Sequence, residues 1–556
     1  MHIEVSMNQT MNTHFKSITE NIIEFLLFSF GISVLFQILL YFLNLTLSPF
    51  SFFLPIFIYP FFRAYVKKAK VLNWHIPIVY IIIALVSFLL ILYFNGFIEH
   101  SFDGNMYHGE AMVQMLKGWN PVFNTNAYAS SIGYEWAVLY PKFTWIYSAF
   151  WIQLTGFSST GMLLNAFIAL ITTLKVILFT LKKTQSIWIA FVVGLFVLLN
   201  PIFIEQLHSF YVDALMSNLL LLLILYNLEL AEDFDYSRLF FIVLISILII
   251  NTKFTGFAFA GLIDLATFSY LVLKHKELAI KYFFAGIIII IIGVGVIGYS
   301  PYFVNLLNSR NIFFPLMGEN KWDIISYMIP EPMIPLRSYE RFLYSLRMGK
   351  PYLENLLKIE ENGYLYYDQR IGGFGSQFFK LLILSSIIIV TSIFTKIRRI
   401  KLYEAFMFVL YGVTILINFR NIWWARYAPQ LWYIIPLSLM LLLISKKLKA
   451  IKTTLALFMV LLVVFQAQDI YKHTYERDQF ITQEAKIVYD TLRKKEDLIF
   501  YVDGGALNQF AVFEEFKARE YGLDIETVLY AAPSEPNECY RLDNYRICVV
   551  IENELD

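Results

Sequence analysis

The chain has 556 residues, of which 58% are hydrophobic and 18% aromatic, and its mean hydropathy is +0.60. This composition excludes an ordinary soluble protein of this length and predicts an all-α polytopic membrane protein in contact with membrane lipids. The net charge is only +1. Because nucleic-acid binding requires a concentrated basic surface, we expect no nucleic-acid partner.

Apolar stretches long enough to cross about 30 Å of hydrocarbon recur along the whole chain. They lie at residues 21–45, 47–65, 76–98, 160–181, 186–204, 208–230, 238–252, 254–273, 279–300, 377–395, 402–418, 427–444 and 451–468. Lysines and arginines gather in five of the short connections, and the positive-inside rule places all five on the cytoplasmic side if each stretch crosses once. The sequence therefore predicts about 13 transmembrane helices, with a cytoplasmic N-terminus and an extracytoplasmic C-terminus.

Residues 142–157 are apolar enough to suggest a further span. A crossing there would place Lys182 and Lys183 outside and would invert the orientation of every later stretch. We therefore interpret 142–157 as a juxtamembrane or re-entrant segment. The alternative is a true span that is compensated by another miscounted span further along the chain.

This count places two long loops, 99–137 and 301–376, and the C-terminal tail on the outer side. We expect short juxtamembrane helices in the first of these loops. Long loops commonly form lids or binding surfaces, which makes both loops candidates for the functional site. Residues 1–468 then form the transmembrane domain, and residues 469–556 form a separate extracytoplasmic domain.

The composition of the tail is that of a small α/β domain. A helical pattern over 475–495 precedes two strand-like runs, 498–502 and 545–551. The only two cysteines of the chain, Cys539 and Cys548, also lie here, on the side of the membrane where thiols are oxidised. A disulfide between them and two separately buried thiols are both open at this point.

The most unusual polar stretch is in the first outer loop. If a helix begins near Asp103, one of its faces carries a polar stripe and the opposite face is apolar. The stripe consists of Asp103, Tyr107, Glu110, Gln114 and Lys117. Such a helix is expected to lie on the membrane surface with the stripe facing water. The alternative is that Asp103 only caps the N-terminus of the helix.

Further polar residues stand at the ends of later spans on the same side. His208 and Asp213 flank the junction of two adjacent spans, where polar groups need partners. Lys253 is placed either to extend harmlessly to the interface or to meet an anionic headgroup. Arg420 and Arg426 lie where the positive-inside rule expects few cations, and arginine is well suited to gripping a phosphate.

Several residues of the first loop are ligands that divalent cations accept. Glu99, Asp103, His108 and Glu110 lie close together in the sequence, and a Mg²⁺ or Mn²⁺ ion at Asp103 and Glu110 is one interpretation. Their spacing matches no specific ligand motif. The sequence contains no Walker loop, no dinucleotide fingerprint and no GxSxG elbow, so the usual signatures of nucleotide donors and serine hydrolysis are missing.

Four short motifs together with the acidic first loop resemble a known family. They are Tyr140-Pro-Lys142, Gly156-Phe157, Asn200-Pro201 followed by Tyr211-Val-Asp213, and Arg426-Tyr-Ala-Pro429. Over roughly residues 76–440 the chain is similar to the GT-C superfamily of membrane glycosyltransferases. The likeness is greatest to the bacterial branch of protein O-mannosyltransferases and aminoarabinose transferases. That branch takes a sugar from a polyprenyl-phosphate carrier on the extracytoplasmic face, so the resemblance implies a bacterial inner (plasma) membrane.

The resemblance implies that Asp103 is the catalytic acidic residue of the first loop and that Lys142 contacts the donor phosphate. The first loop of the family often carries paired acidic residues. Here the nearest acidic neighbours of Asp103 are Glu99 and Glu110. This departure leaves open which carboxylate is the base and whether a metal takes part.

We therefore expect an inverting transfer of a sugar from a polyprenyl-phosphate donor to a hydroxyl of a glycan, lipid or protein acceptor, with Asp103 as base. The expected catalytic residues are Asp103, Glu99, His108 and Glu110. The residues expected to bind the donor phosphate are Lys142, Lys253, Arg426 and Arg420. The residues expected in the acceptor or polar pocket are Tyr107, His208 and Asp213. Two alternatives remain, namely a lipid-linked polysaccharide polymerase or ligase and a non-enzymatic transporter or flippase.

Overall fold

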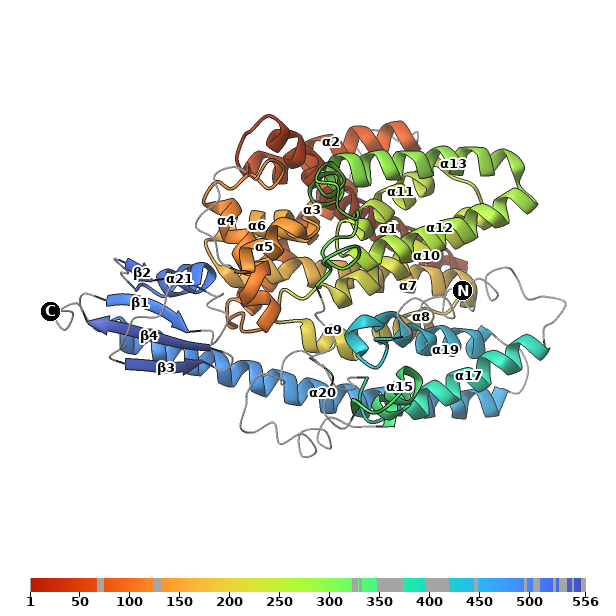
Figure 1. Cartoon of the computed structure of the whole chain (residues 1–556). Helices are drawn as coiled ribbons and strands as arrows, with labels where there is room; N and C mark the ends of the chain where they lie inside the picture. The colour runs from red at the N-terminus through yellow and green to blue at the C-terminus, as the bar shows by residue number, and fades with distance from the viewer. Residues whose placement is uncertain are drawn as a thin grey trace.

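The computed structural model of the chain is a bundle of helices with a small β-sheet at one end (Figure 1). It describes residues 2–67, 75–124, 132–322, 329, 333–347, 374–395, 420–444, 449–494, 498–503, 511–523, 527–529, 538–542 and 545–551.

Eight helical segments of this described part are long and apolar enough to cross a membrane. The helices concerned are α1 (His2–Phe42), α2 (Pro49–Lys67), α3 (His75–Phe94), α7 (Leu163–Thr184), α10 (Asp213–Glu232), α12 (Phe254–Lys274), α13 (Lys276–Ile290), which continues as η3 (Ile291–Ile297), and α20 (Lys449–Leu492). Shorter apolar helices are α8 (Ile187–Leu198), α11 (Tyr236–Ile250), α17 (Phe378–Thr395) and α19 (Ile434–Ile444), the last preceded by η9 (Pro429–Tyr433). Each predicted apolar stretch except 402–418, which lies outside the described residues, overlaps one of these helices. The four shorter helices do not reach the length of a span, so eight of the predicted crossings have a helix of sufficient length in the described part of the chain.

The burial of these helices separates the centre of the bundle from its periphery. In its most apolar window α10 is 94% buried, and it packs against α7, α11 and α12. The same measure is 11% for α3, whose outward side chains are almost all apolar. Because exposed apolar side chains at such a density require lipid around them, α3 lies at the lipid-facing surface and α10 in the core.

The segment 142–157 forms a short helix, α6 (Phe143–Thr155), and not a membrane span. Its 13 residues rise about 20 Å, which is less than the roughly 30 Å of hydrocarbon. All side chains from Phe143 to Ile152 are buried, and the helix ends at Gly156, whose φ of +79° favours glycine. This agrees with the juxtamembrane or re-entrant interpretation.

The polar first loop contains two short helical segments beside α6. They are η1 (Gly104–His108), a π-helical turn, and α4 (Gly109–Leu116). A further helix, α5 (Ile132–Leu139), follows in the same loop. The expected short helices of the first loop are therefore present.

The tail begins inside a continuous helix. The 44 residues of α20 rise about 66 Å, which is roughly twice the thickness of the hydrocarbon, so the helix extends well beyond one span. In Figure 1 it runs from the bundle to the sheet. The predicted domain boundary at 468–469 falls within this helix, and so does most of the helical pattern predicted over 475–495.

The sheet has the strand order β2-β1-β4-β3. Its elements are β1 (Leu498–Asp503), α21 (Ala511–Glu520), β2 (Thr527–Leu529), β3 (Glu538–Leu542) and β4 (Tyr545–Ile551). Strand β1 pairs in parallel with β2 across α21, and antiparallel with β4, which pairs antiparallel with β3. The strands predicted at 498–502 and 545–551 are confirmed as β1 and β4. The register of β3 and β4 places Cys539 directly opposite Cys548.

Candidate active site

Asp103 directly precedes the π-helical turn η1, so a helical segment begins near Asp103, as predicted. Its side chain makes no capping hydrogen bond. Instead, Asp103 Oδ2 accepts a hydrogen bond of 2.7 Å from Arg426 Nη2, across more than 300 positions of sequence. The capping interpretation of Asp103 is therefore wrong, and its carboxylate takes part in a tertiary ion pair.

Four of the predicted site residues meet here in one group, which we call the charge cluster: Asp103, Asp213, Lys253 and Arg426. Arg426 Nε donates to Asp213 Oδ2 at 3.1 Å, and Lys253 Nζ donates to Asp213 Oδ1 at 2.5 Å. Two carboxylates thus face two cations, and their formal charges cancel. The side chain of Asp103 is 17% exposed and that of Asp213 only 1%, so Asp103 is the carboxylate that a substrate reaches more readily.

Besides Asp103, which precedes η1, the cluster takes its members from the beginnings of two helices and from one short 3-10 helix. Asp213 is the first residue of α10, Lys253 directly precedes α12, and Arg426 lies in η8 (Ala425–Tyr427). The positive end of the α10 dipole favours a carboxylate at this position. Gln206 fixes the carboxylate further, because its Nε2 donates to Asp213 Oδ2 at 3.0 Å while its Oε1 accepts from the backbone N–H of Ala214.

Lys253 is not free to extend to the interface, because it is buried in its ion pair with Asp213. Two tyrosine rings cover the cations. The ammonium of Lys253 lies 4.6 Å from the ring centre of Tyr427, and the guanidinium of Arg426 lies 4.4 Å from that of Tyr211. Such contacts stabilise a desolvated cation and hold its position.

An aromatic wall lies beside Asp103. The rings of Tyr107, Tyr140 and Trp145 contact one another and that of His108. His108 Nδ1 accepts a 2.6 Å hydrogen bond from Trp145 Nε1, and burial lowers the pKa of this imidazole to about 3. His108 is therefore neutral, with its proton on Nε2. Burial also raises the pKa of Tyr107 well above its ordinary value, so that its phenol stays protonated.

The structure places Lys142 and Arg420 outside the charge cluster. Lys142 Nζ donates to the carbonyls of Val138, at 2.9 Å, and of Tyr140. Burial lowers the pKa of Lys142 well below its ordinary value, because a desolvated ammonium is disfavoured. In the described part of the chain no hydrogen bond or ion pair joins Lys142 to the cluster. Arg420 is exposed in the turn that precedes η8.

Glu99 braces the backbone of two loops. Its Oε1 accepts from the N–H of Ser101 and its Oε2 from the N–H of Phe210, both at 2.7 Å. The side chain is fully buried, which raises the pKa of the carboxyl to about 7. The first loop, which leads to Asp103, is thereby tied to the segment that leads to Asp213.

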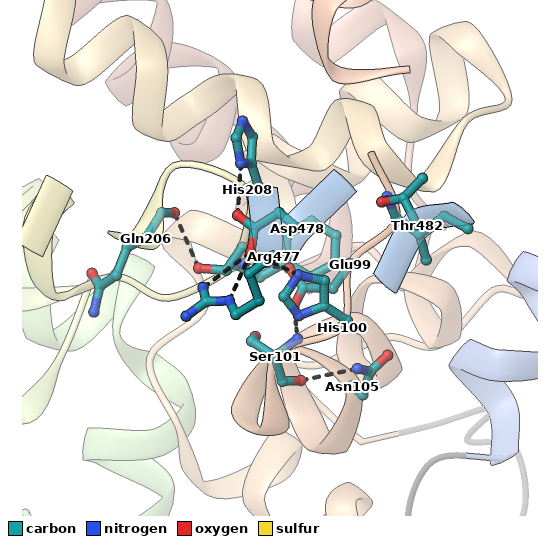
Figure 2. A network of polar contacts seen from close by, with 12 residues as sticks. Glu99, His100, Ser101, Asn105, Gln206, His208, Arg477, Asp478 and Thr482 are labelled. Atoms are coloured by element: carbon teal, nitrogen blue, oxygen red, sulfur yellow. Dashed lines mark hydrogen bonds and ion pairs between the residues drawn. The ribbon is translucent and has the colours of Figure 1, made fainter. Parts of the chain in front are cut away.

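A second network joins the same two loops to α20 (Figure 2). Asp478 Oδ1 lies 3.2 Å from His100 Nε2, and Asp478 Oδ2 lies 2.8 Å from His208 Nδ1. The other ring nitrogen of His208 lies 2.8 Å from the hydroxyl of Tyr93, and its ring stacks on Phe97 at 3.8 Å. His208 thus belongs to this supporting network, and within the described residues no hydrogen bond or ion pair joins it to the charge cluster.

Sequence reasoning missed Asp478 and the role of His100. An aspartate on the water-exposed half of a long helix carries no distinguishing signal, because most such residues are solvated. The one available indication was that His100 and Asp103 belong to the same short polar stretch. It did not indicate a partner 378 positions away.

The prediction that the polar stripe of the first loop faces water is wrong for Glu110 and Gln114. Both side chains are fully buried, and Gln114 Nε2 donates to Glu110 Oε1 at 2.8 Å. Helix α21 of the tail covers this face, with Phe513 packed so closely on Gly109 that a Cβ atom there would lie 2.4 Å from its ring. Burial raises the pKa of Glu110 to about 7.

The residues present do not fit the divalent cation that the sequence suggested. Asp103 and Glu110 contact different partners, Arg426 and Gln114. Among the residues that the structure describes, no group of three or more His, Cys, Asp or Glu side chains is arranged to hold a metal ion. Both carboxylates of the charge cluster are already neutralised by cations, so we derive no step through a metal.

Comparison with known proteins gives two similar solved structures. No protein-family model and no curated protein matches the chain. The crystal structure of ArnT from Cupriavidus metallidurans bound to undecaprenyl phosphate is 11% identical, with a TM-score of 0.45, over 85% of this chain and 97% of that chain. The structure of ArnT in the apo state is 12% identical, with a TM-score of 0.36, over 78% of this chain and 84% of that chain. Because these values are low, the function proposed for this chain rests on the charge cluster.

Proposed function

We propose that this protein is a membrane glycosyltransferase that moves a sugar from a polyprenyl-phosphate carrier to an acceptor hydroxyl on the extracytoplasmic face. The observation that carries the proposal is the charge cluster, in which the partly exposed carboxylate of Asp103 contacts Arg426, and Asp213 joins Arg426 to Lys253. Asp213 and Lys253 lie at the beginnings of the membrane-length helices α10 and α12. A carrier lipid diffuses in the bilayer, so its phosphate arrives at such helix ends. Glycosyl transfer from that phosphate needs a base and a cationic clamp side by side.

In this mechanism Asp103 accepts the proton of the acceptor hydroxyl. The acceptor oxygen then bonds to the anomeric carbon, while the bond from that carbon to the phosphate oxygen breaks and its electron pair remains on the phosphate. Lys253 and Arg426 stabilise the charge that develops on the leaving phosphate. A single displacement of this kind inverts the anomeric configuration. Asp213 stays ionised between the two cations and holds them in place.

The ion pair between Asp103 and Arg426 links donor binding to the strength of the base. A carboxylate that is bound to a guanidinium is a weak base, because the adjacent positive charge stabilises its ionised form. An arriving phosphate competes with Asp103 for the N–H donors of Arg426. Donor binding therefore releases Asp103, so that the base becomes active only when the leaving group is in place.

The side chains around the cluster have supporting roles in this proposal. His108 presents a neutral Nε2–H and Tyr107 a protonated hydroxyl, and both are suited to hydrogen-bonding sugar hydroxyls. Lys142 would have to turn its amine away from two backbone carbonyls in order to reach the phosphate. A phosphate dianion nearby would raise the pKa of this amine again, since an opposite charge favours its ionised form.

The decisive experiment compares Asp103→Asn with a control at the other end of the same bundle. Asp103→Asn keeps the size of the side chain and one acceptor oxygen for Arg426, but it removes the base. We expect a loss of about 10²- to 10⁴-fold in turnover of a polyprenyl-monophosphate sugar. Asp233→Asn alters a carboxylate that is exposed at the end of α10 opposite Asp213, and it should leave turnover unchanged.

The assay measures release of polyprenyl phosphate by purified protein, with thermal unfolding measured in parallel. A polyprenyl-diphosphate oligosaccharide serves as the alternative donor, since a polymerase or ligase would use that substrate. The proposal fails if Asp103→Asn is folded and turns over the monophosphate sugar at the parental rate. It also fails if only the diphosphate donor is consumed.

A further inference from the structure

The turn between α11 and α12 consists of Asn251, Thr252 and Lys253. Its first two residues are fully buried, although a connection between helices normally lies on the surface. The turn brings Lys253 to the charge cluster, because Lys253 directly precedes α12 and pairs with Asp213. The contacts that hold this turn therefore also determine where the ammonium of Lys253 lies.

The side chain of Asn251 joins the turn to a neighbouring helix. Its Nδ2 donates to the carbonyl of Ile247, at 2.9 Å, and to the carbonyl of Gly293, at 2.8 Å. Gly293 lies in the π-helical segment η3, which continues α13. Such π-helical turns are frequent at functional sites, and a side chain that enters the hydrogen-bond ladder of a helix distorts it locally. Asn251 thus ties the turn to the distorted part of this helix.

The main chain of Asn251 reaches a third element. Its carbonyl accepts a hydrogen bond of 3.2 Å from the N–H of Phe143, the first residue of α6. Amides at the start of a helix have no partner within the helix, and Asn251 supplies one. Lys142 directly precedes this amide in the chain. One asparagine therefore connects the turn that carries Lys253, the segment η3 and the start of α6.

The stability of the fold does not explain an asparagine at this position. Both carbonyls that its side chain binds also have a backbone donor, because the N–H of Asn251 donates to Ile247 at 3.1 Å and the N–H of Gly298 donates to Gly293 at 3.0 Å. Asn251 Oδ1 is buried and has no hydrogen-bond partner among the residues that the structure describes. An unpaired buried acceptor is unfavourable. An apolar side chain of similar size would remove this cost and leave both carbonyls with a donor.

We propose that Asn251 is a positioning residue of the phosphate clamp, which holds the turn so that Lys253 meets Asp213. The inference rests on the proposed function, because it assumes that Lys253 contacts the donor phosphate. Within the described part of the chain, no hydrogen bond or ion pair joins Asn251 itself to the charge cluster. Its side chain gives up stability and fixes the position of a group that acts on the phosphate, and catalysis depends strongly on such positions.

The first test compares Asn251→Leu with a matched control, Asn227→Leu, in the purified full-length protein. Asn227 is also buried and bonds to Tyr282 and Asp264, but it lies about 21 Å along α10 from Asp213. In Asn251→Leu, kcat/KM for a polyprenyl-monophosphate sugar should fall about 10- to 100-fold, with Tm unchanged or raised. In Asn227→Leu, Tm should fall and kcat/KM should be unchanged. An unchanged kcat/KM in Asn251→Leu would overturn the inference.

A second measurement does not require sugar transfer. The amine of Lys253 is buried in its ion pair, so its acylation by an amine-reactive ester, measured by mass spectrometry, reports how often the turn opens. Asn251→Leu should raise the rate of this labelling about 10-fold, because the loss of a buried hydrogen bond shifts local opening by about that factor. If the wild type transfers no sugar, the proposed function fails, and the labelling still decides the role of Asn251.

The labelling overturns the inference if Lys253 reacts equally fast in wild type and in Asn251→Leu. It does so too if Asn227→Leu raises the rate as much, since the bundle would then be loosened in general. A double variant tests the route of the effect. Asn251→Leu combined with Lys253→Met should lower kcat/KM no further than Lys253→Met alone, because both changes act on the same contact. Additive losses would show that Asn251 does not act through Lys253.

Discussion

Asp478 offers a sharp test of how the site is held together, because it lies on a distant helix and yet contacts both loops that lead to the site carboxylates. It pairs with His100, three residues before Asp103, and with His208, five residues before Asp213. Substituting Asp478 by Ala removes both contacts at once. Substituting it by Asn keeps the shape and leaves one acceptor oxygen.

The two contacts of Asp478 with His100 and His208 set the expected loss of stability and of rate. Each buried hydrogen bond to a charged group contributes about 1.5–3 kcal/mol, so the two bonds to the histidines amount to about 3–6 kcal/mol in Asp478→Ala. Asp478→Asn should cost about half as much. The loops then lose their anchor, and a displacement of about 1 Å at the reacting groups lowers the rate on the order of 100-fold. In the proposed mechanism Lys253 and Arg426 contact the phosphate and are not displaced, so kcat should fall more than the KM for the donor rises.

The assay combines thermal unfolding with kcat and KM for a polyprenyl-monophosphate sugar, measured on the folded fraction. His208→Gln removes one end of the same network, so the double variant with Asp478→Asn should lose less than the sum of the two single losses. A fall in Tm with kcat unchanged would show that Asp478 only stabilises the fold. Strictly additive losses would show that the two residues do not act together.

Three further predictions follow from local geometry. Burial raises the pKa of Glu110 from 4.5 to about 7, so between these pH values the native state binds more protons than the unfolded state. The free energy of unfolding should therefore fall by about 3 kcal/mol as the pH rises from 4.5 to 7. In Glu110→Gln, pH-dependent unfolding should lack this fall, while sugar transfer continues. Cys539 and Cys548 are directly opposed in the sheet, at a backbone separation that a disulfide spans, so mass spectrometry without reductant should find them linked rather than as two free thiols. Lys142→Met should raise the KM for the donor, and an unchanged KM would remove this residue from the phosphate site.

The members of the charge cluster could be predicted, but their pairing could not. Asp103, Asp213, Lys253 and Arg426 stand out because charged groups at the ends of apolar helices are costly and therefore rare. The positive-inside rule also suggested that they share one side of the membrane. Which cation meets which carboxylate depends on how α10, α12 and η8 pack, and no local pattern encodes that arrangement.

The prediction that the polar stripe of the first loop faces water failed for the same reason, because the contact that buries it is made by a distant part of the chain. The period of α4 correctly indicated one polar and one apolar face. Water was the natural partner for the polar face, because nothing nearby in the sequence offered another. The actual cover is α21, which carries Phe513 and Glu515 and lies about 400 positions later in the chain. The lengths of the apolar stretches located the membrane-length helices. The composition, however, gave no sign that α20 continues across the predicted domain boundary at 468–469.

The tail is joined to the helical bundle through the continuous helix α20 and contacts the first loop directly. A domain that is merely attached would leave the first loop complete without it. Instead, α20 supplies Asp478 to the loop at His100, and Lys517 of α21 donates to the carbonyl of Glu99 at 3.1 Å and to Asn105 Oδ1 at 2.7 Å. These contacts lie on both sides of Asp103 in the sequence. The last part of the chain therefore completes the scaffold around the first acidic loop, and the proposed role of Asp103 as base requires such a scaffold, because a base acts only from a fixed position.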